Sequence, residues 1–246
     1  MNANSLYSDY NAITPVYERA SSAITLGLIG RWRRLTIRLG LKALGNCNAI
    51  NVLDAGSGPG NMTIELIKSG VNPRRVVLLD QSMVMLKSSP RLGVIDEVCG
   101  LFELMPFRDS VFNMVIMGFS LHASSNLRKA YCEISRVLKA GGVLASVSIG
   151  KPNNPIYRAL GWLYTAAAIP LITLVTAGPR YIRYFYDIHN IYVRLPPNNT
   201  FRGMAKGCLN LIEYRDEALG LANVTVMKIA PSSLHALASF TTLMRV

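Results

Sequence analysis

The feature that most constrains the fold is a glycine-rich turn between an apolar run and a helical pattern. The apolar run ends in Asp54, and the segment 54–60 reads DAGSGPG. Glycine accepts positive φ angles and lets a ligand approach the backbone closely, and the helix that follows begins with unpaired N–H groups. The spacing G-x-G-x-G is not the dinucleotide fingerprint G-x-G-x-x-G, and a P-loop would need G-K-[ST]. Taken alone, such a turn is only a weak sign of a ligand site.

A second acid strengthens this interpretation. The short apolar run 76–79 ends in Asp80, about twenty residues after the turn, where an acid is placed to hold a ribose diol. Together these positions look like the S-adenosylmethionine (SAM) site of class I methyltransferases. The residues concerned are Asp54, Gly56, Gly58, Gly60 and Asp80. The alternative is a Rossmann-like domain that holds another nucleotide, or none.

Strand-like and helix-like segments alternate between residues 50 and 149. Near-continuous apolar runs, as at 111–117, are typical of parallel strands buried on both faces. The alternation predicts an α/β fold with a doubly wound sheet, whose ligands bind at the carboxyl ends of the strands. Further strands are predicted over 93–99 and 142–149, and helices over 61–70, 82–87 and 126–138.

The rest of the chain divides around this core. Helical patterns over 11–20 and 22–44 predict an N-terminal cap (1–45) ahead of the SAM-binding core (46–150). Residues 151–200 depart from the rhythm and are predicted to form a lid or substrate insertion. Residues 201–246 are predicted to return to the same single domain, with a helix over 201–220 and closing strands at 223–229 and 234–243.

An uncharged stretch of unusual length lies inside the insertion. Residues 159–178 carry no charge, and their length and polarity fit a transmembrane helix. Pro170 in the middle, the flanking α/β sequence and the lack of a second span argue against that. A lid over an apolar substrate, or a helix pair in a bilayer interface, explains the stretch better. The remaining alternative is a buried helical hairpin broken at Pro170.

Charge and cysteine content narrow the setting. The net charge is +12, which suits nucleic acid, an anionic membrane surface or acidic substrates, or simply solvates the surface. The four scattered cysteines suggest neither a zinc site nor a disulfide framework, and no metal is predicted. The N-terminus lacks a signal-peptide pattern, so a cytoplasmic location is expected.

Two aromatic and basic clusters stand outside the core. The segment 31–34 reads RWRR, which suits a cap over the ligand or an anionic contact, or a solvated face with one buried Trp. The segment 181–187 reads YIRYFYD, which suits either stacking on nucleic-acid bases or a pocket for a quinone-like ring.

Taken together, the motifs resemble the ubiquinone/menaquinone C-methyltransferase family of class I SAM-dependent enzymes, over nearly the whole chain. The resemblance rests on DAGSGPG at 54–60, LLD ending at Asp80, MPFRDSVFNMV at 105–115, EISRVLKAGG at 133–142 and KPNNPIYRAL at 151–160, with looser pieces at Tyr17-Glu18, 31–33 and Leu234-His235. It implies a seven-stranded, mostly parallel sheet whose last strand is antiparallel.

The same resemblance implies roles in SAM binding. The turn glycines would pass under SAM, Asp80 would hold its ribose, Leu101 and Phe102 would line the adenine and Met117 would face the methionine end, with Tyr17, Asp54 and Gln81 as further contacts. Two positions depart from the family pattern. Leu101 stands where many relatives carry Asp, and His122-Ala123 stands where the family shows Arg-Asn.

Methyl transfer from a sulfonium depends mainly on alignment, whereas carbon methylation of a quinol also needs a base for the hydroxyl. His122 is the first candidate base, Tyr184 and Asp187 are others, His189 is a lesser one, and Arg183 could hold a phenolate. The expected function is C-methylation of a prenylated quinol or similar aromatic acceptor, by an enzyme peripheral at the inner face of the membrane. A homodimer stays open.

Other functions remain in view. A methyltransferase for a small cytosolic metabolite or RNA is one alternative, although the N/D-P-P-Y/F motif of amino-methylating nucleic-acid enzymes is absent from MGFSLH at 117–122. The other alternative is a non-catalytic module that binds SAM or a membrane.

Overall fold

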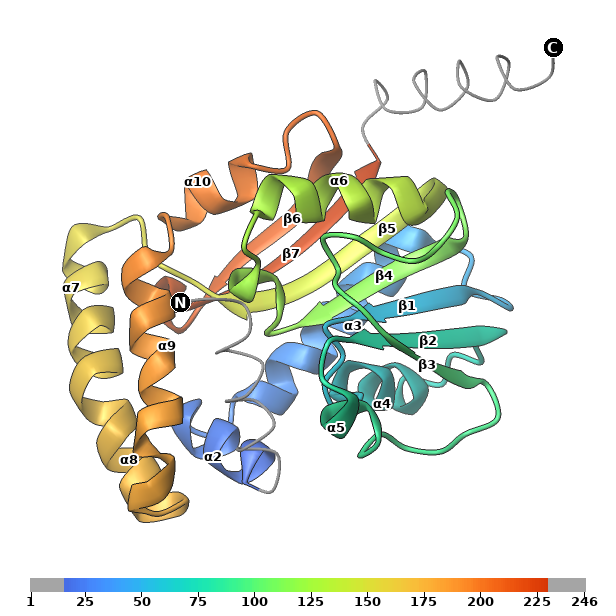
Figure 1. The fold of residues 1–246 in the computed structure, drawn as a ribbon. Helices are drawn as coiled ribbons and strands as arrows, with labels where there is room; N and C mark the ends of the chain where they lie inside the picture. The colour runs from blue at the N-terminus through green and yellow to red at the C-terminus, as the bar shows by residue number, and fades with distance from the viewer. Residues whose placement is uncertain (1–15, 230–246) are drawn as a thin grey trace, which may run out of the picture.

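A seven-stranded sheet forms the centre of the molecule, seen here in a computed structural model that describes residues 16–229 (Figure 1). The strand order is β3-β2-β1-β4-β5-β7-β6. β7 is antiparallel to both neighbours and the other pairs are parallel, which confirms the predicted sheet. The strands are β1 (Asn51–Ala55), β2 (Arg75–Asp80), β3 (Ile95–Cys99), β4 (Phe112–Gly118), β5 (Leu138–Ile149), β6 (Leu209–Glu217) and β7 (Ala222–Ile229).

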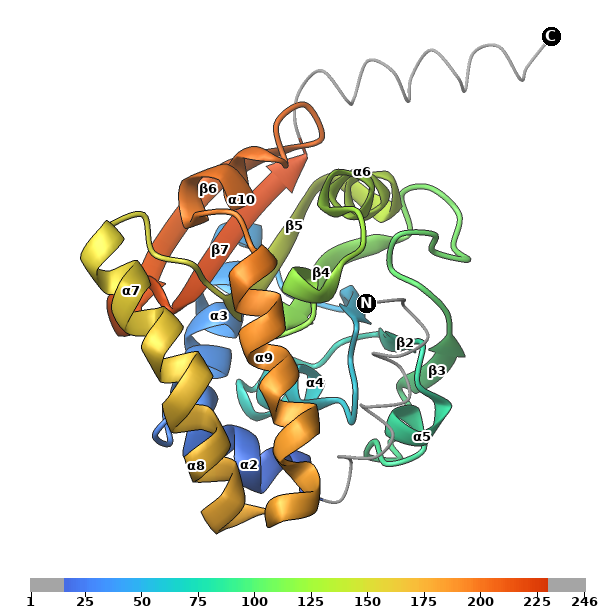
Figure 2. The same cartoon turned by 60° about the vertical axis from the view of Figure 1, so that its left-hand side comes forward.

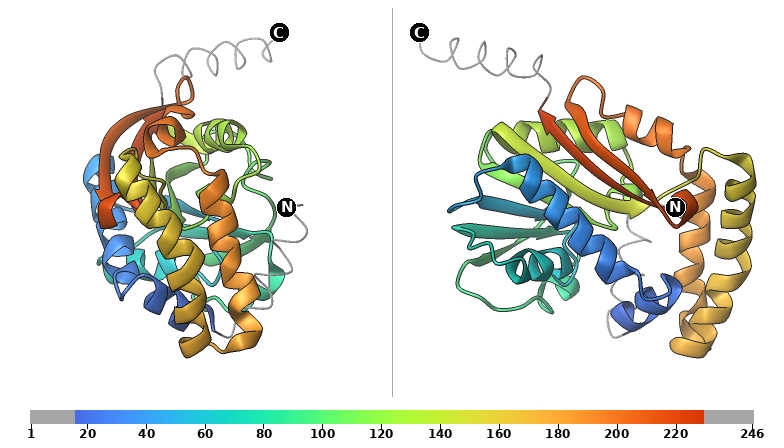
Figure 3. Two further views of the ribbon diagram at one scale, coloured as in Figure 1. Left: turned by 90° about the vertical axis from the view of Figure 1, so that its left-hand side faces the viewer. Right: turned by 180° about the vertical axis from the view of Figure 1, so that it is seen from behind.

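Helices cover both faces of this sheet. α3 (Ile29–Leu44) and α4 (Asn61–Lys68) lie on one face, and α6 (Leu127–Val137) lies on the other (Figure 3). The side chains of β4 alternate between the two layers, with Met114 and Ile116 packed beneath α3 and α4, and Val115 and Met117 packed toward α6. This alternation is the period-two pattern of a strand buried on both sides. A short helix, α5 (Met83–Leu86), follows β2.

α3 sits unusually close to the sheet. A Cβ on Gly40 would lie 2.4 Å from Met114 Cε and 2.6 Å from Ala145 Cβ, so only glycine permits this approach. α3 is therefore part of the sheet layer. Of the N-terminal helices, only α2 (Tyr17–Ile24) lies away from it, against the helical insertion.

The insertion forms a hairpin beyond the carboxyl ends of the strands (Figure 2). Its first arm is continuous, running through α7 (Pro155–Leu163), a π-helical segment η2 (Tyr164–Ala168) and α8 (Ile169–Thr176). The turn η3 (Pro179–Tyr181) leads into the second arm, α9 (Ile182–Arg194). The alternative of a hairpin broken at Pro170 is wrong. The missing N–H of Pro170 falls in the first turn of α8, directly after the wider π-helical turns, where the helix can accommodate it.

The predicted helix over 201–220 is also wrong. Only α10 (Asn198–Gly203) is helical there, and β6 and the turn η4 (Ala218–Gly220) follow. β6 is an edge strand that is mostly exposed, so its residues are polar and lack the apolar run of a buried strand. The strand predicted at 234–243 and the pair Leu234-His235 lie outside the described residues.

The expectation of no disulfide is corrected by the structure. Cys132 of α6 and Cys208, just before β6, form a disulfide across 76 residues of sequence. Packing of α6 beside the start of β6 brings them together, and Ser135 Oγ donates a hydrogen bond to the Cys208 carbonyl (2.9 Å). Cys99 is exposed and Cys47 is half-buried, and neither is bonded to another cysteine.

Candidate active site

The glycine-rich loop turns above the end of β1. The φ angles of Gly56, Gly58 and Gly60 are +66°, +53° and +80°, a region in which glycine carries no steric penalty. A Cβ on Gly56 would lie 2.4 Å from Ser120 Cβ, whereas a Cβ on Gly58 would meet nothing within 4 Å. The loop is therefore packed against protein at Gly56 and open at Gly58.

We expect Gly56→Ala to lower the free energy of unfolding by about 1–3 kcal/mol more than Gly70→Ala does. Gly70 also has a positive φ (+83°), but a Cβ there meets nothing within 4 Å, so the control carries the backbone strain without the clash. Chemical denaturation of both variants measures the difference. Equal losses would mean that Ser120 moves aside without cost.

Asp80 ends β2 beside this loop. Its Oδ2 accepts a hydrogen bond from the Gly58 N–H (2.8 Å), and its Oδ1 accepts one from the Ser82 N–H (2.8 Å). Burial raises the pKa of this carboxyl, and the backbone N–H groups of Ser82, Gly58 and Gln81 oppose that shift. Each carboxylate oxygen retains a lone pair for a ligand hydroxyl.

A cavity of about 780 Å³ opens beside the loop; we call it the glycine-loop cavity. Its volume falls in the range of small-molecule and cofactor sites. The predicted site residues that line it are Tyr17, Gly56, Gly58, Asp80, Gln81, Leu101, Phe102 and His122.

Arg33 also lines this cavity, although only its cluster had been singled out in the sequence. Its side chain is buried and makes two hydrogen bonds to the Glu18 carboxylate, of 3.0 and 3.1 Å. Arg33 Nε is buried with no partner among the described residues. Trp32 is buried as well, whereas Arg31 and Arg34 are exposed, so the cluster divides between the site and the solvent.

Asp54 does not line the cavity. Its side chain is fully buried, and Oδ2 accepts hydrogen bonds from the N–H (3.1 Å) and the hydroxyl (2.8 Å) of Thr63. Asp54 therefore anchors the start of α4 beneath the loop. Burial raises its pKa to about 7 against the opposing effect of the Thr63 hydrogen bonds.

Met117 and Gly60 lie outside the cavity lining too. Met117 is fully buried in the core toward α6, because it occupies the inward position of β4. The residues that reach the cavity at this strand end are Gly118 and Phe119, which follow it. Phe119 has a positive φ (+58°), a strained backbone for an aromatic residue and one that composition does not reveal.

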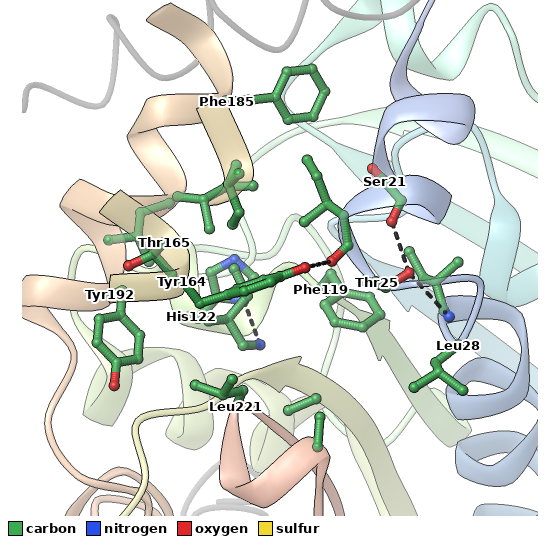
Figure 4. A pocket seen from close by; sticks show the side chains of 18 of the residues that line it. Ser21, Thr25, Leu28, Phe119, His122, Tyr164, Thr165, Phe185, Tyr192 and Leu221 are labelled. Atoms are coloured by element: carbon green, nitrogen blue, oxygen red, sulfur yellow. Dashed lines mark hydrogen bonds between the residues drawn. The ribbon is translucent and has the colours of Figure 1, made fainter. Parts of the chain in front are cut away.

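A second cavity, of about 330 Å³, adjoins the first; we call it the helical pocket (Figure 4). Its walls come from α2, the start of α3, the hairpin and the turn before β7, and they are almost entirely apolar. Tyr164, Phe185, Tyr192 and Leu221 lie around it (Figure 4). Tyr17, Phe119, His122 and Ile191 line both cavities, so the two spaces meet at these side chains.

His122 lies in the short helix η1 (Leu121–Ala123), at this junction. Its Nδ1 accepts a hydrogen bond from the Ile149 N–H (3.4 Å), which assigns the proton of the neutral ring to Nε2. Burial lowers the pKa of His122 to about 4, so the ring is uncharged near neutral pH. The neutral ring therefore has an N–H to donate, not a free nitrogen to accept a proton.

Tyr184 and Asp187 of α9 both line the helical pocket. An Asp187 oxygen accepts a hydrogen bond from Asn190 Nδ2 (3.0 Å). The Arg183 guanidinium lies 4.4 Å from the centre of the Tyr184 ring and also hydrogen-bonds its hydroxyl. The other lesser candidate, His189, is buried within the hairpin, where its Nδ1 is 2.9 Å from the Thr165 hydroxyl. The structure thus brings His122 and Asp187 to one pocket and leaves His189 out of it.

Comparison with known proteins agrees with this geometry. Residues 3–228 match the model of the ubiE/COQ5 methyltransferase family. The chain is 28% identical over 221 residues to a demethylmenaquinone methyltransferase of Roseiflexus sp. (strain RS-1), covering 87% of this chain and 89% of that one. It is 30% identical over 184 residues to a demethylmenaquinone methyltransferase of Lactiplantibacillus plantarum (strain ATCC BAA-793 / NCIMB 8826 / WCFS1), covering 72% and 76%.

Among solved structures, a putative methyltransferase in a complex with the Haloferax volcanii Trm112 activator superposes with a TM-score of 0.60 at 15% identity, covering 90% of this chain and 97% of that one. At that identity the likeness concerns the fold alone. The family match spans the sheet, the glycine loop and the hairpin together. The chain therefore belongs to the ubiE/COQ5 methyltransferase family and is a SAM-dependent methyltransferase.

Proposed function

We propose that this enzyme C-methylates an apolar aromatic acceptor of the prenylated quinol type. The observation that carries the proposal is the junction of the two cavities, where an apolar pocket meets the glycine-loop cavity at Tyr17, Phe119, His122 and Ile191. An acceptor in the helical pocket would lie beside a methyl donor in the other cavity. The names of the relatives, demethylmenaquinone methyltransferase among them, support this acceptor class.

The residues around the glycine-loop cavity fit SAM. Gly58 offers an open backbone, Asp80 offers acceptors for ribose hydroxyls, and Leu101 and Phe102 offer apolar contact for adenine. Arg33, with its buried Nε, is suited to the carboxylate of the methionine end. When bound, SAM supplies a methyl group activated by its sulfonium.

The pocket residues must then handle the proton of the acceptor hydroxyl. We assign its removal to the Asp187 carboxylate, because His122 holds its own proton on Nε2. The Nε2–H of His122 donates a hydrogen bond to the acceptor oxygen as negative charge develops on it. That charge enriches the ring carbon that takes the methyl group, and loss of the hydrogen on that carbon restores the aromatic ring. Tyr184, held by Arg183, positions the ring.

Replacing His122 tests its assigned role. We expect His122→Phe to lower kcat about 10–100-fold, the value of one hydrogen bond to a charged group. His122→Gln keeps an N–H donor and should recover part of the loss, while the affinity for SAM stays unchanged in both. With a pKa of about 4 in the wild type, His122 gives kcat no inflection between pH 6 and 8. Such an inflection in the wild type, lost in His122→Gln, would instead identify His122 as the base.

A label-transfer assay tests the function. Purified enzyme is incubated with methyl-labelled SAM and a chemically reduced, short-chain prenylated naphthoquinol, and the product is analysed by mass spectrometry for a new carbon–methyl bond. The same naphthoquinol without its prenyl chain, and total RNA, serve as competing acceptors. We expect label on the prenylated ring carbon. Label only on RNA or on a water-soluble metabolite would overturn the proposal.

A further inference from the structure

The α7–α8 arm is packed the wrong way round for a helix of a water-exposed domain. Its buried positions recur every four residues as Gly161, Thr165, Ile169 and Thr173, so mostly small side chains face the protein. A Cβ on Gly161 would lie 2.4 Å from Leu221 Cδ2 and 2.5 Å from the Tyr192 hydroxyl, which shows how close the arm approaches.

The large apolar side chains of the arm point outward instead. Leu171 is 62% exposed and Val175 is 79% exposed. We call this surface the outer apolar face; it consists of Ile156, Leu160, Trp162, Leu163, Leu171, Leu174 and Val175. Helix packing places the arm at the outer edge of the molecule, beyond α9 (Figures 1 and 2). A contiguous apolar patch of this kind marks an interaction surface.

Charge around the face indicates the kind of partner. No acidic residue occurs between residues 151 and 186, whereas Lys151, Arg158, Arg180 and Arg183 flank the arm at its two ends. Arg180 and Arg183 are exposed. An apolar surface with basic ends complements a bilayer that carries anionic headgroups.

The arm is long and apolar enough to cross a membrane, as a single helix over Pro155–Thr176 among residues 16–229. Its contacts with the protein favour a position along the membrane surface instead. The Tyr164 hydroxyl donates a hydrogen bond to the Ile24 carbonyl (2.6 Å), and Tyr164, Thr165 and Ile169 form a wall of the helical pocket. Crossing the bilayer would break these contacts and open the pocket.

Two exposed leucines mark the mouth of that pocket. Leu26 is 74% exposed and Leu219 is 59% exposed, and both line the pocket with positive φ angles (+51° and +58°). Strained backbone at exposed apolar side chains is uncommon and is found at binding sites. The mouth is therefore apolar where it meets the solvent, beside the arm that forms the pocket wall.

We infer that the outer apolar face docks on an anionic lipid bilayer, with the α7–α8 arm lying in the interface and the mouth of the helical pocket beside the acyl region. This rests on the proposed function, because docking gives a prenylated acceptor an apolar route into the pocket. The inference concerns lipid as the partner; a second copy of this chain is the competing occupant.

Vesicle binding by the full chain tests the inference. Flotation is compared on vesicles of phosphatidylcholine alone and of equal parts phosphatidylcholine and phosphatidylglycerol. We expect stronger binding to the anionic vesicles, weakened by salt, and at least about a tenfold loss of binding in the double variant Leu171→Glu/Val175→Glu. Neither residue lines the helical pocket.

The matched control is Leu211→Glu/Ile212→Glu. These two side chains are also exposed (45% and 51%), but they lie on the edge strand β6, away from the arm. We expect the control to bind vesicles as the wild type does. Equal binding by both double variants, or an arm variant that changes the oligomeric state seen by light scattering while binding vesicles normally, would overturn the inference.

Tryptophan fluorescence gives a second readout. The chain has two tryptophans; Trp32 is 4% exposed and Trp162, on the outer apolar face, is 52% exposed. Vesicles should shift the emission to shorter wavelength, brominated lipid should quench it, and Trp162→Phe should abolish both changes. Turnover of a water-soluble short-chain quinol separates the two proposals. An arm variant that loses vesicle binding but keeps this turnover supports docking, whereas a wild type without turnover contradicts only the proposed function.

Discussion

Asp80→Asn should lower the affinity for SAM about 10²–10³-fold. Hydrogen bonds from ribose hydroxyls to a charged carboxylate are worth about 1.5–3 kcal/mol each, and the neutral amide weakens both. The change also disturbs the loop, because an amide N–H₂ cannot accept the hydrogen bond that Gly58 or Ser82 now donates to the carboxylate. Isothermal titration calorimetry with SAM measures the effect.

Asp96→Asn provides the matched control for this variant. Asp96 belongs to β3, the neighbour of β2, and forms an ion pair with Arg75 on the surface, outside the glycine-loop cavity. An exposed pair of this kind contributes little to stability. We expect the control to bind SAM as the wild type does. Unchanged affinity in Asp80→Asn would mean that Asp80 only shapes the loop and that another group holds the ribose.

The second large effect concerns Asp54 and the dependence of stability on pH. The folded pKa of Asp54 is about 7, above the ordinary value of 3.8, because the carboxyl is fully buried. Between these values the folded state holds a proton that the unfolded state has released. Stability from this group is therefore fully present below pH 3.8 and is lost as the pH rises through about 7. The loss is about 1.4 kcal/mol for each pH unit in that window, about 4 kcal/mol in all.

Asp54→Asn isolates this contribution. Asparagine keeps a carbonyl oxygen for the two hydrogen bonds from Thr63 but does not titrate. We expect the free energy of unfolding of the wild type to fall relative to that of the variant as the pH rises from 5 to 7, and the difference to level off above that. Denaturant titrations at several pH values measure it. Parallel curves for the two proteins would show that Asp54 is already ionised in the folded state at pH 5.

The sequence identified the parts of the site that depend on local backbone conformation. The turn glycines need positive φ angles wherever the loop lies, and Asp80 ends an apolar run whose direction is set by the parallel sheet. Those residues line the glycine-loop cavity together with Gln81, Leu101 and Phe102. The same signals are weaker at the sheet edge, where β6 is exposed and polar, and there the predicted helix was wrong.

Side chains whose role depends on their neighbours were harder to assign. Asp54 lies beside the turn glycines in sequence, yet it binds Thr63 below the loop. Met117 falls on the core side of β4 because strand residues alternate, and the next two residues reach the cavity. His122 lies at the junction of the cavities, but the Ile149 N–H decides which of its nitrogens carries the proton.

The sequence by itself determined the doubly wound sheet, the ligand loop and the SAM chemistry, because each follows from backbone preferences and from apolar runs short enough to read locally. Only the tertiary structure decided what depends on long-range packing. It joined Cys132 to Cys208, set the helical pocket beside the glycine-loop cavity, and turned the large apolar side chains of the α7–α8 arm outward. Those features depend on which residues meet across the fold, and no local pattern of residues specifies that.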